Sequence, residues 1–216
     1  MASNGSFSAF EEGYPVWYFR GYQVDHLDEK GNPVFRDNDK NGVIDASDKA
    51  MIGKPMPDFT YGVTLAANYK NFDLLVFGNG SVGNDVFMSY SYNHIFYPLK
   101  EIYDQRWTPD GSTNRKYARP QLTNADKYGL SDAYIFDGSY FRIKQIQLGY
   151  TFPKKLIKHA LLENVRVYAS LDNFFLFTKY PGLDPEVSST STSGMGVDYG
   201  NYPTTKKVVF GLSVTF

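Results

Sequence analysis

The sequence predicts an all-β fold, namely an antiparallel transmembrane β-barrel segment of about six strands with long extracellular loops. Three observations lead to this class. Apolar residues recur at every second position in six segments, short and long connections alternate between those segments, and the 216 residues include 17 Phe and 18 Tyr. A membrane barrel presents one face of each strand to lipid and the other to its lumen, and it carries aromatic residues at both interfaces.

The predicted strands differ in how clearly they alternate. The clearest is 58–69, and 14–25 is the weakest. In 139–152 the apolar positions are odd before Lys144 and even after it, which predicts a β-bulge or the bilayer boundary at that point. The last segment ends on Phe216, which suits an aromatic residue at the membrane interface. The predicted strands span residues 14–25, 58–69, 71–81, 139–152, 163–173 and 206–216.

The connections between the predicted strands alternate in length. The short ones are the turn at Lys70 and Asn71 and a stretch of about ten residues after 152, long enough for one or two helical turns. The other three contain about 30, 55 and 30 residues. Outer-membrane barrels have short periplasmic turns and long extracellular loops, whereas connections in soluble domains usually contain about 4–6 residues. Because soluble sandwiches also alternate, the alternative is a secreted, soluble β-sandwich that binds carbohydrate or mediates adhesion.

Composition and motifs exclude several classes of function. A net charge of −1 provides no basic surface, so we expect no nucleic-acid partner. The lack of cysteine excludes disulfides, zinc–thiolate sites and thiol catalysis. The three histidines, His26, His94 and His159, are far apart in the sequence and have no patterned partners. We therefore predict no catalytic residues and no enzyme activity.

Seven short motifs, each weak alone, form an ordered set. They are IGKPMPDFTYG at 52–62 followed by YKNFDL at 69–74, RWTP at 106–109, DGSYFRIK at 137–144, LGYTFP at 148–153, DNF at 172–174, GLDPE at 182–186 and DYGNYP at 198–203. In this order and spacing they resemble the C-terminal portion of the SusC/RagA-type TonB-dependent outer-membrane transporters of Bacteroidetes. The resemblance extends from about residue 13 to residue 216.

The resemblance implies an architecture and a set of partners. The family has a 22-stranded barrel, an N-terminal plug domain and a TonB box, and it works with a SusD-like surface lipoprotein to import oligosaccharides or peptides, including glycan uptake. We expect residues 1–216 to be the C-terminal part of such a barrel, without the plug domain, TonB box and signal peptide. The resemblance thus implies a location in the outer membrane, in contact with lipid, and a chain that needs the missing N-terminal region to contact TonB and to transport.

One acidic loop matches the pattern of a calcium-binding loop. Its oxygen donors alternate around Gly42, the residue type that the sharp turn needs. The last ligand position holds Asp48 in place of the usual Glu, so we expect weak binding, with a Kd of about 10⁻⁴–10⁻³ M. Calcium would stiffen the loop, both in a transporter and in the soluble alternative; the other interpretation is a surface turn without metal. The predicted ligands are Asp37, Asp39, Asn41, the Val43 carbonyl, Asp45 and Asp48.

An aromatic-rich stretch in the longest connection is a weak candidate for substrate binding. Tyr and Trp rings stack on sugars and line peptide paths, but they also pack long loops onto neighbouring surfaces. The candidate residues are Tyr90, Tyr92, Tyr97 and Trp107.

Three lysines, Lys154, Lys155 and Lys158, follow the predicted strand 139–152. They form either a solvated face or a contact with lipid phosphates on the periplasmic side.

Overall fold

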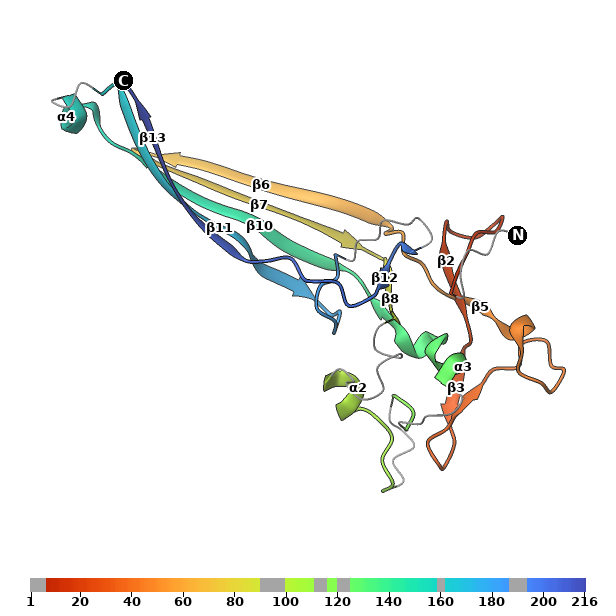
Figure 1. Ribbon diagram of the computed structural model, residues 1–216. Helices are drawn as coiled ribbons and strands as arrows, with labels where there is room; N and C mark the ends of the chain where they lie inside the picture. Colours follow the sequence, from red (N-terminus) through yellow and green to blue (C-terminus); the bar gives the residue numbers. More distant parts are fainter. Residues whose placement is uncertain (1–6, 90–99, 111–115, 120–124, 159–161, 187–193) are drawn as a thin grey trace. The chain divides into compact units, whose positions relative to one another are not determined.

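The computed structural model describes residues 7–89, 100–110, 116–119, 125–158, 162–186 and 194–216. The chain forms two compact units, each assembled from three stretches of sequence. Unit 2 contains the long strands, and unit 1 contains short strands and helical turns (Figure 1). Unit 1 comprises Met1–Asp58, Gly83–Ser139 and Lys179–Tyr202, and unit 2 comprises Phe59–Val82, Tyr140–Thr178 and Pro203–Phe216.

Unit 2 is one sheet of five long strands in the order β13-β11-β10-β7-β6 (Figure 1). Every neighbouring pair is antiparallel. Five of the predicted strands are confirmed, and the main difference is that β11 runs five residues further than 163–173. The strands are β6 Phe59–Tyr69, β7 Phe72–Val82, β10 Tyr140–Thr151, β11 Asn164–Thr178 and β13 Lys207–Thr215.

The register of this sheet aligns apolar side chains in rows across all five strands. Two such rows are Leu65, Val76, Ile146, Leu171 and Val208, and Ala67, Leu74, Leu148, Ala169 and Phe210. Much of this face remains exposed, with Leu65 57% and Phe210 80% accessible. The opposite face is mostly small or polar, with Leu75, Phe77, Leu176 and Val209 as apolar exceptions. The sheet therefore has one continuous apolar face, as a strand wall in contact with lipid requires.

The predicted irregularity at Lys144 is confirmed as a β-bulge. Against β7 the register shifts between Ile143 and Gln145, so Lys144 is an extra residue on β10. Against β11 the register shifts at the same place, but there the extra residue lies on β11, where Asn173 has a φ of 60°. Asn adopts this left-handed conformation more readily than most residues. The bulges keep the apolar residues of β10 on one face although their positions change from odd to even.

The two short connections lie at one end of the sheet. Lys70, with a φ of 56°, and Asn71 form the tight turn between β6 and β7. The other connection contains α4 (Lys154–Ile157), a single helical turn, as predicted. The backbone N–H of Thr151 donates to the Asn71 carbonyl oxygen at 2.9 Å, which ties the two connections together.

Unit 1 packs short elements around its own hydrophobic core. Phe19, Phe87, Met88, Tyr117 and Val197 are among the fully buried side chains of this core. Its strands are β1 Ser8–Ala9, β2 Tyr18–Gly21, β3 Val24–Leu27, β4 Pro33–Phe35, β5 Ala50–Gly53, β8 Asp85–Met88, β9 Ile135–Asp137 and β12 Val197–Asp198. Its helices are η1 Ala46–Asp48, α2 Lys100–Asp104, α3 Ala125–Gly129 and η2 Asp132–Tyr134. None of the helices in the described parts of the chain is long and apolar enough to cross a membrane.

The prediction of a barrel strand at 14–25 is wrong. This segment lies in unit 1 and contributes β2 and β3 to two different small sheets. Trp17 has a φ of 55°, which breaks an extended conformation before β2 begins. Tyr18 and Phe19 are both buried although they are adjacent. Phe19 belongs to the core of unit 1, whereas Tyr18 stacks on Tyr14 and donates a hydrogen bond to Glu11.

Candidate functional site

The polar face of the unit 2 sheet carries an ion pair that crosses a strand. Asp73 on β7 and Arg166 on β11 lie on either side of β10. Arg166 Nε donates to Asp73 Oδ1 at 2.9 Å, and Nη2 donates to Oδ2 at 2.5 Å. The residue between them is Gly149, where a Cβ would lie 2.4 Å from both Arg166 Nη2 and Asp73 Oδ1. The absence of a side chain at this position lets the two charged groups meet.

Tyr168 extends this arrangement to β13. The Arg166 guanidinium lies 5.1 Å from the centroid of the Tyr168 ring, within the range of a cation–π contact. The ring itself covers Gly211, where a Cβ would approach ring carbons at 2.1 Å. The network therefore braces β7, β10, β11 and β13 and presents fixed charge on the polar face.

Sequence reasoning did not identify this network. Asp73 and Arg166 occupy polar-face positions, each within three residues of the start of a strand that follows a short connection. Opposite charges at nearly the same distance from the start of two strands are the sequence signal that could have indicated an ion pair.

Aromatic rings gather at both ends of the apolar face. At one end the ring of Phe141 lies 5.7 Å from Tyr61 and 6.3 Å from Phe177. Near the short connections Phe72 and Tyr150 lie 4.8 Å apart. On β10 the two belts are about nine residues apart, which corresponds to about 30 Å along the strand and about 23 Å across a membrane at a tilt of about 40°. This matches the apolar band of about 25 Å between aromatic girdles in outer-membrane barrels.

The predicted calcium loop brings three of its six candidate ligands together. Carboxylate oxygens of Asp37, Asp39 and Asp48 lie within 4.8 Å of one another. Asp45 instead caps η1 by accepting a hydrogen bond from the Ser47 backbone N–H at 2.8 Å. The remaining two candidates bond to each other, the Asn41 Oδ1 accepting from the Val43 N–H at 2.7 Å. A cluster of carboxylate oxygens is the donor set that calcium prefers. Calcium binding at this loop stays a prediction.

The carboxyls of the loop differ in their electrostatic surroundings. The backbone N–H of Asp45 donates to Asp48 at 2.9 Å, and that of Asn38 donates at 2.7 Å. These bonds, led by that from Asp45, hold the pKa of the Asp48 carboxyl below its ordinary value. Desolvation and the neighbouring negative charges of Asp48 and Asp37 raise the pKa of Asp39. A cation at the cluster would offset this repulsion.

The candidate aromatic residues for substrate binding are only partly within the described structure. Tyr90, Tyr92 and Tyr97 lie outside the described residues. The ring of Trp107 covers Gly31, where a Cβ would lie 2.4 Å from it. Its buried indole N–H has no hydrogen-bond partner in the described structure. Trp107 thus packs its loop onto the β3–β4 hairpin, and substrate contact by these four residues stays a prediction.

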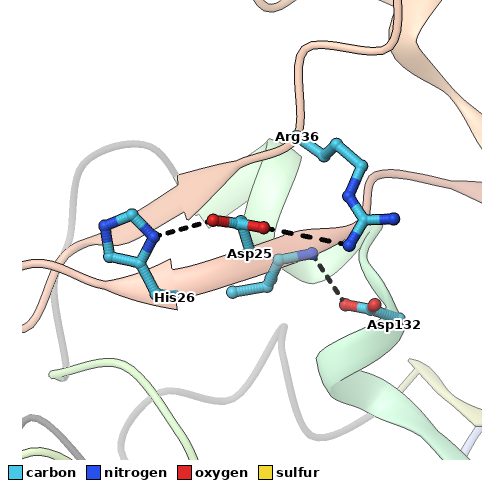
Figure 2. Close-up of polar contacts among 5 residues, drawn as sticks. Asp25, His26, Arg36 and Asp132 are labelled. Carbon is cyan, nitrogen blue, oxygen red and sulfur yellow. Dashed lines mark hydrogen bonds and ion pairs between the residues drawn. The ribbon is translucent and has the colours of Figure 1, made fainter.

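A charged cluster on the β3–β4 hairpin contains the one Asp–His contact of the described residues (Figure 2). His26 Nδ1 lies 3.0 Å from Asp25 Oδ2, and Arg36 Nη2 lies 3.8 Å from Asp25 Oδ1. The Val24 N–H donates to Asp132 of η2 at 3.0 Å. His26 and Asp25 are more than half exposed, and no nucleophile bonds to His26 within the described part of the chain. The cluster therefore has the character of a surface ion-pair network and not of a catalytic dyad.

The chain is similar over most of its length to curated receptors, although no family model matches it. It is 33% identical over 204 residues to TonB-dependent receptor P3 of Formosa agariphila, covering 87% of this chain and 19% of that receptor. It is 33% identical over 219 residues to TonB-dependent receptor SusC of Bacteroides thetaiotaomicron, covering 99% of this chain and 21% of that receptor. The chain thus spans about one fifth of the length of the relatives it matches.

Solved structures share the fold. The RagAB peptide importer in its 'closed-closed' state matches all of this chain and 25% of its own, with a TM-score of 0.76 and 24% identity. The RagAB peptide transporter matches all of this chain and 24% of its own, with a TM-score of 0.78 and 22% identity.

The two-faced antiparallel sheet and its aromatic belts define the class: a segment of a transmembrane β-barrel, which the five described strands do not close. The ordered motifs and the relatives agree on the family. The chain belongs to the SusC/RagA-type TonB-dependent receptors. The names of these relatives describe receptors and importers, which agrees with the predicted lack of enzyme activity.

Proposed function

We propose that the chain is part of an outer-membrane receptor that imports oligosaccharides or peptides with energy supplied through TonB. The observation that carries this proposal is the two-faced sheet of unit 2. Its apolar face is exposed between two aromatic belts, and its polar face carries the ion pair of Asp73 and Arg166. Lipid on one side and an aqueous path on the other is the environment that such a sheet needs.

The soluble alternative fits the sheet less well. A β-sandwich buries the apolar face of each sheet against a second sheet about 10 Å away. Within the described residues Leu65, Leu148 and Phe210 are all at least 50% exposed on that face. Water contact at so many aligned apolar side chains is unfavourable, whereas lipid contact is not.

The partners follow from the same proposal. The TonB-dependent relatives support energy transfer from TonB, which would contact a plug domain and TonB box outside residues 1–216. The likeness to SusC and to the RagAB peptide importer supports a SusD-like surface lipoprotein as partner and a peptide or an oligosaccharide as cargo. We place residues 1–216 in the C-terminal part of the receptor barrel.

Uptake measurements test this function. Deleting the gene that encodes this chain should abolish growth on, and cell uptake of, one labelled oligosaccharide or peptide pool, and deleting tonB should have the same effect. A complemented strain is the control. Unchanged uptake of both pools, or recovery of the protein from the soluble fraction, would overturn the proposal.

We also propose that the loop 37–48 binds one calcium ion that stiffens it. The convergence of Asp37, Asp39 and Asp48 supports this assignment. Calcium at about 1–10 mM, above the expected Kd, should slow proteolysis of the loop in the purified receptor, and a chelator should restore cleavage. The double variant Asp37→Asn/Asp39→Asn should lose the calcium effect, whereas the exposed control Asp25→Asn should keep it. Equal cleavage of the unaltered protein with calcium and with chelator would rule the site out.

A further inference from the structure

The end of unit 2 that carries the short connections has an open cleft. Its volume is about 830 Å³, within the range of small-molecule sites. The ends of β10, β11 and β13 line it together with α4. Figure 1 shows α4 at the end of the sheet where the chain terminates. The three lysines Lys154, Lys155 and Lys158 lie on its wall.

The cleft is strongly cationic. Glu163 is the one acidic residue among the described residues that line it. No ion pair within the described structure involves any of the three lysines, and all three are exposed. Among the described residues, three ammonium groups without an ion-pair partner face one carboxylate of the lining, and this excess of positive charge favours an anion.

The surroundings of the cleft are apolar on one side. Leu156 of α4 is 69% exposed between the lysines, and Phe152 contributes to the lining. The ring of Phe152 lies 5.2 Å from Tyr150, which belongs to the aromatic belt at this end of the sheet. Positive charge thus adjoins the edge of the exposed apolar face. A free phosphate ion would use only the charge, whereas a phospholipid would use both the charge and the apolar surface.

We propose that this cleft binds the headgroup of an anionic phospholipid whose acyl chains lie along the apolar face of the sheet. The proposal rests on the membrane location inferred above. Each lysine near an anionic lipid phosphate contributes about fivefold in affinity, so the three together contribute on the order of 100-fold. The site would anchor the short-connection end of the barrel at the phosphates of the adjacent leaflet.

Native mass spectrometry of the detergent-purified receptor that contains this chain tests the proposal, with phosphatidylglycerol and phosphatidylcholine as probes. We expect the receptor to prefer phosphatidylglycerol. The triple variant Lys154→Gln/Lys155→Gln/Lys158→Gln should lose affinity for phosphatidylglycerol by on the order of 100-fold. Glu163→Gln should raise that affinity about fivefold, because it removes the opposing charge.

A matched control and a competitor make the test specific. The triple variant Lys30→Gln/Lys206→Gln/Lys207→Gln removes the same charge from exposed positions that do not line the cleft and should keep the lipid preference. A heat-modifiable gel shift shows that the barrel is folded in each sample. If the folded receptor binds the two lipids with equal affinity, or if the triple variant at 154, 155 and 158 binds phosphatidylglycerol as tightly as the unaltered receptor, the headgroup site is overturned. Full displacement of the lipid by millimolar inorganic phosphate would instead indicate a free-anion site. Absence of the gel shift in the unaltered receptor would overturn both the site and the proposed function.

Discussion

Replacing Gly149 by alanine should lower the stability of the unit 2 sheet, although alanine in a strand is usually less destabilising than glycine. The added Cβ would lie 2.4 Å from Arg166 Nη2 and 2.4 Å from Asp73 Oδ1, so one or both side chains must shift, and we expect this shift to separate the ion pair. Two hydrogen bonds between charged groups, each worth about 1.5–3 kcal/mol, are then lost. Water offsets part of this loss, because the Arg166 and Asp73 side chains are 25% and 30% exposed. Alanine also returns about 0.5–1 kcal/mol of backbone entropy.

The net destabilisation should be about 1–2 kcal/mol, a change of about 5- to 30-fold in the unfolding equilibrium. Guanidinium unfolding of the receptor in detergent micelles, followed by tryptophan fluorescence and by heat-modifiable mobility, measures it. Gly62→Ala on β6 is the matched control, since a Cβ there meets no atom closer than 3.8 Å. In a receptor that already carries Arg166→Met, the further change Gly149→Ala should lower the free energy of unfolding only slightly, because no ion pair remains to be broken. Equal unfolding midpoints for the two single alanine variants would refute the bracing role of the pair.

Two further predictions concern the apolar face and the acidic loop. Val76→Arg, midway between the aromatic belts, should destabilise the folded barrel by about 2–4 kcal/mol in the same unfolding assay, whereas Gln147→Arg on the polar face should change stability by less than about 1 kcal/mol. Similar losses for both would argue against lipid contact on one face only. The pKa of Asp48 is lower in the folded loop than in the unfolded chain, where it is about 4, so the ionised carboxyl stabilises the loop. This stabilisation is complete above about pH 4 and is lost as the pH falls below that value. Limited proteolysis of the loop should therefore accelerate on acidification, and Asp48→Asn should be cleaved with little dependence on pH over that range.

Local alternation predicted the long strands well because each face of a strand has the same kind of surroundings along its whole length, apolar on one side and polar on the other. The bulge at Lys144 was predictable because an extra residue changes the parity of the apolar positions. The same reasoning failed at 14–25, where Tyr14, Val16 and Tyr18 alternate by coincidence. The core of unit 1 is built from residues distant in sequence, and a pattern in one segment does not reveal it.

The network on the polar face depends on register, which local sequence does not determine. Asp73 and Arg166 meet only because β10 lies between their strands with Gly149 at the crossing point. In the acidic loop the motif predicted the convergence of Asp37, Asp39 and Asp48. It did not predict that Asp45 would cap η1, because the motif does not specify the helical turn that follows.

Site-directed spin labelling along β10 tests most directly whether the sheet separates lipid from an aqueous lumen. The sequence contains no cysteine, so single labels at positions 145–148 and 150 report on their own sites within this chain. Gly149 is left unlabelled because a side chain there would displace the ion pair. In the reconstituted receptor, collisions with oxygen, which dissolves in lipid, should peak at Ile146, Leu148 and Tyr150. Collisions with a water-soluble nickel chelate should peak at Gln145 and Gln147, which lie on the polar face. Equal access of the chelate to all positions, or the reverse alternation, would contradict the assignment of the two faces.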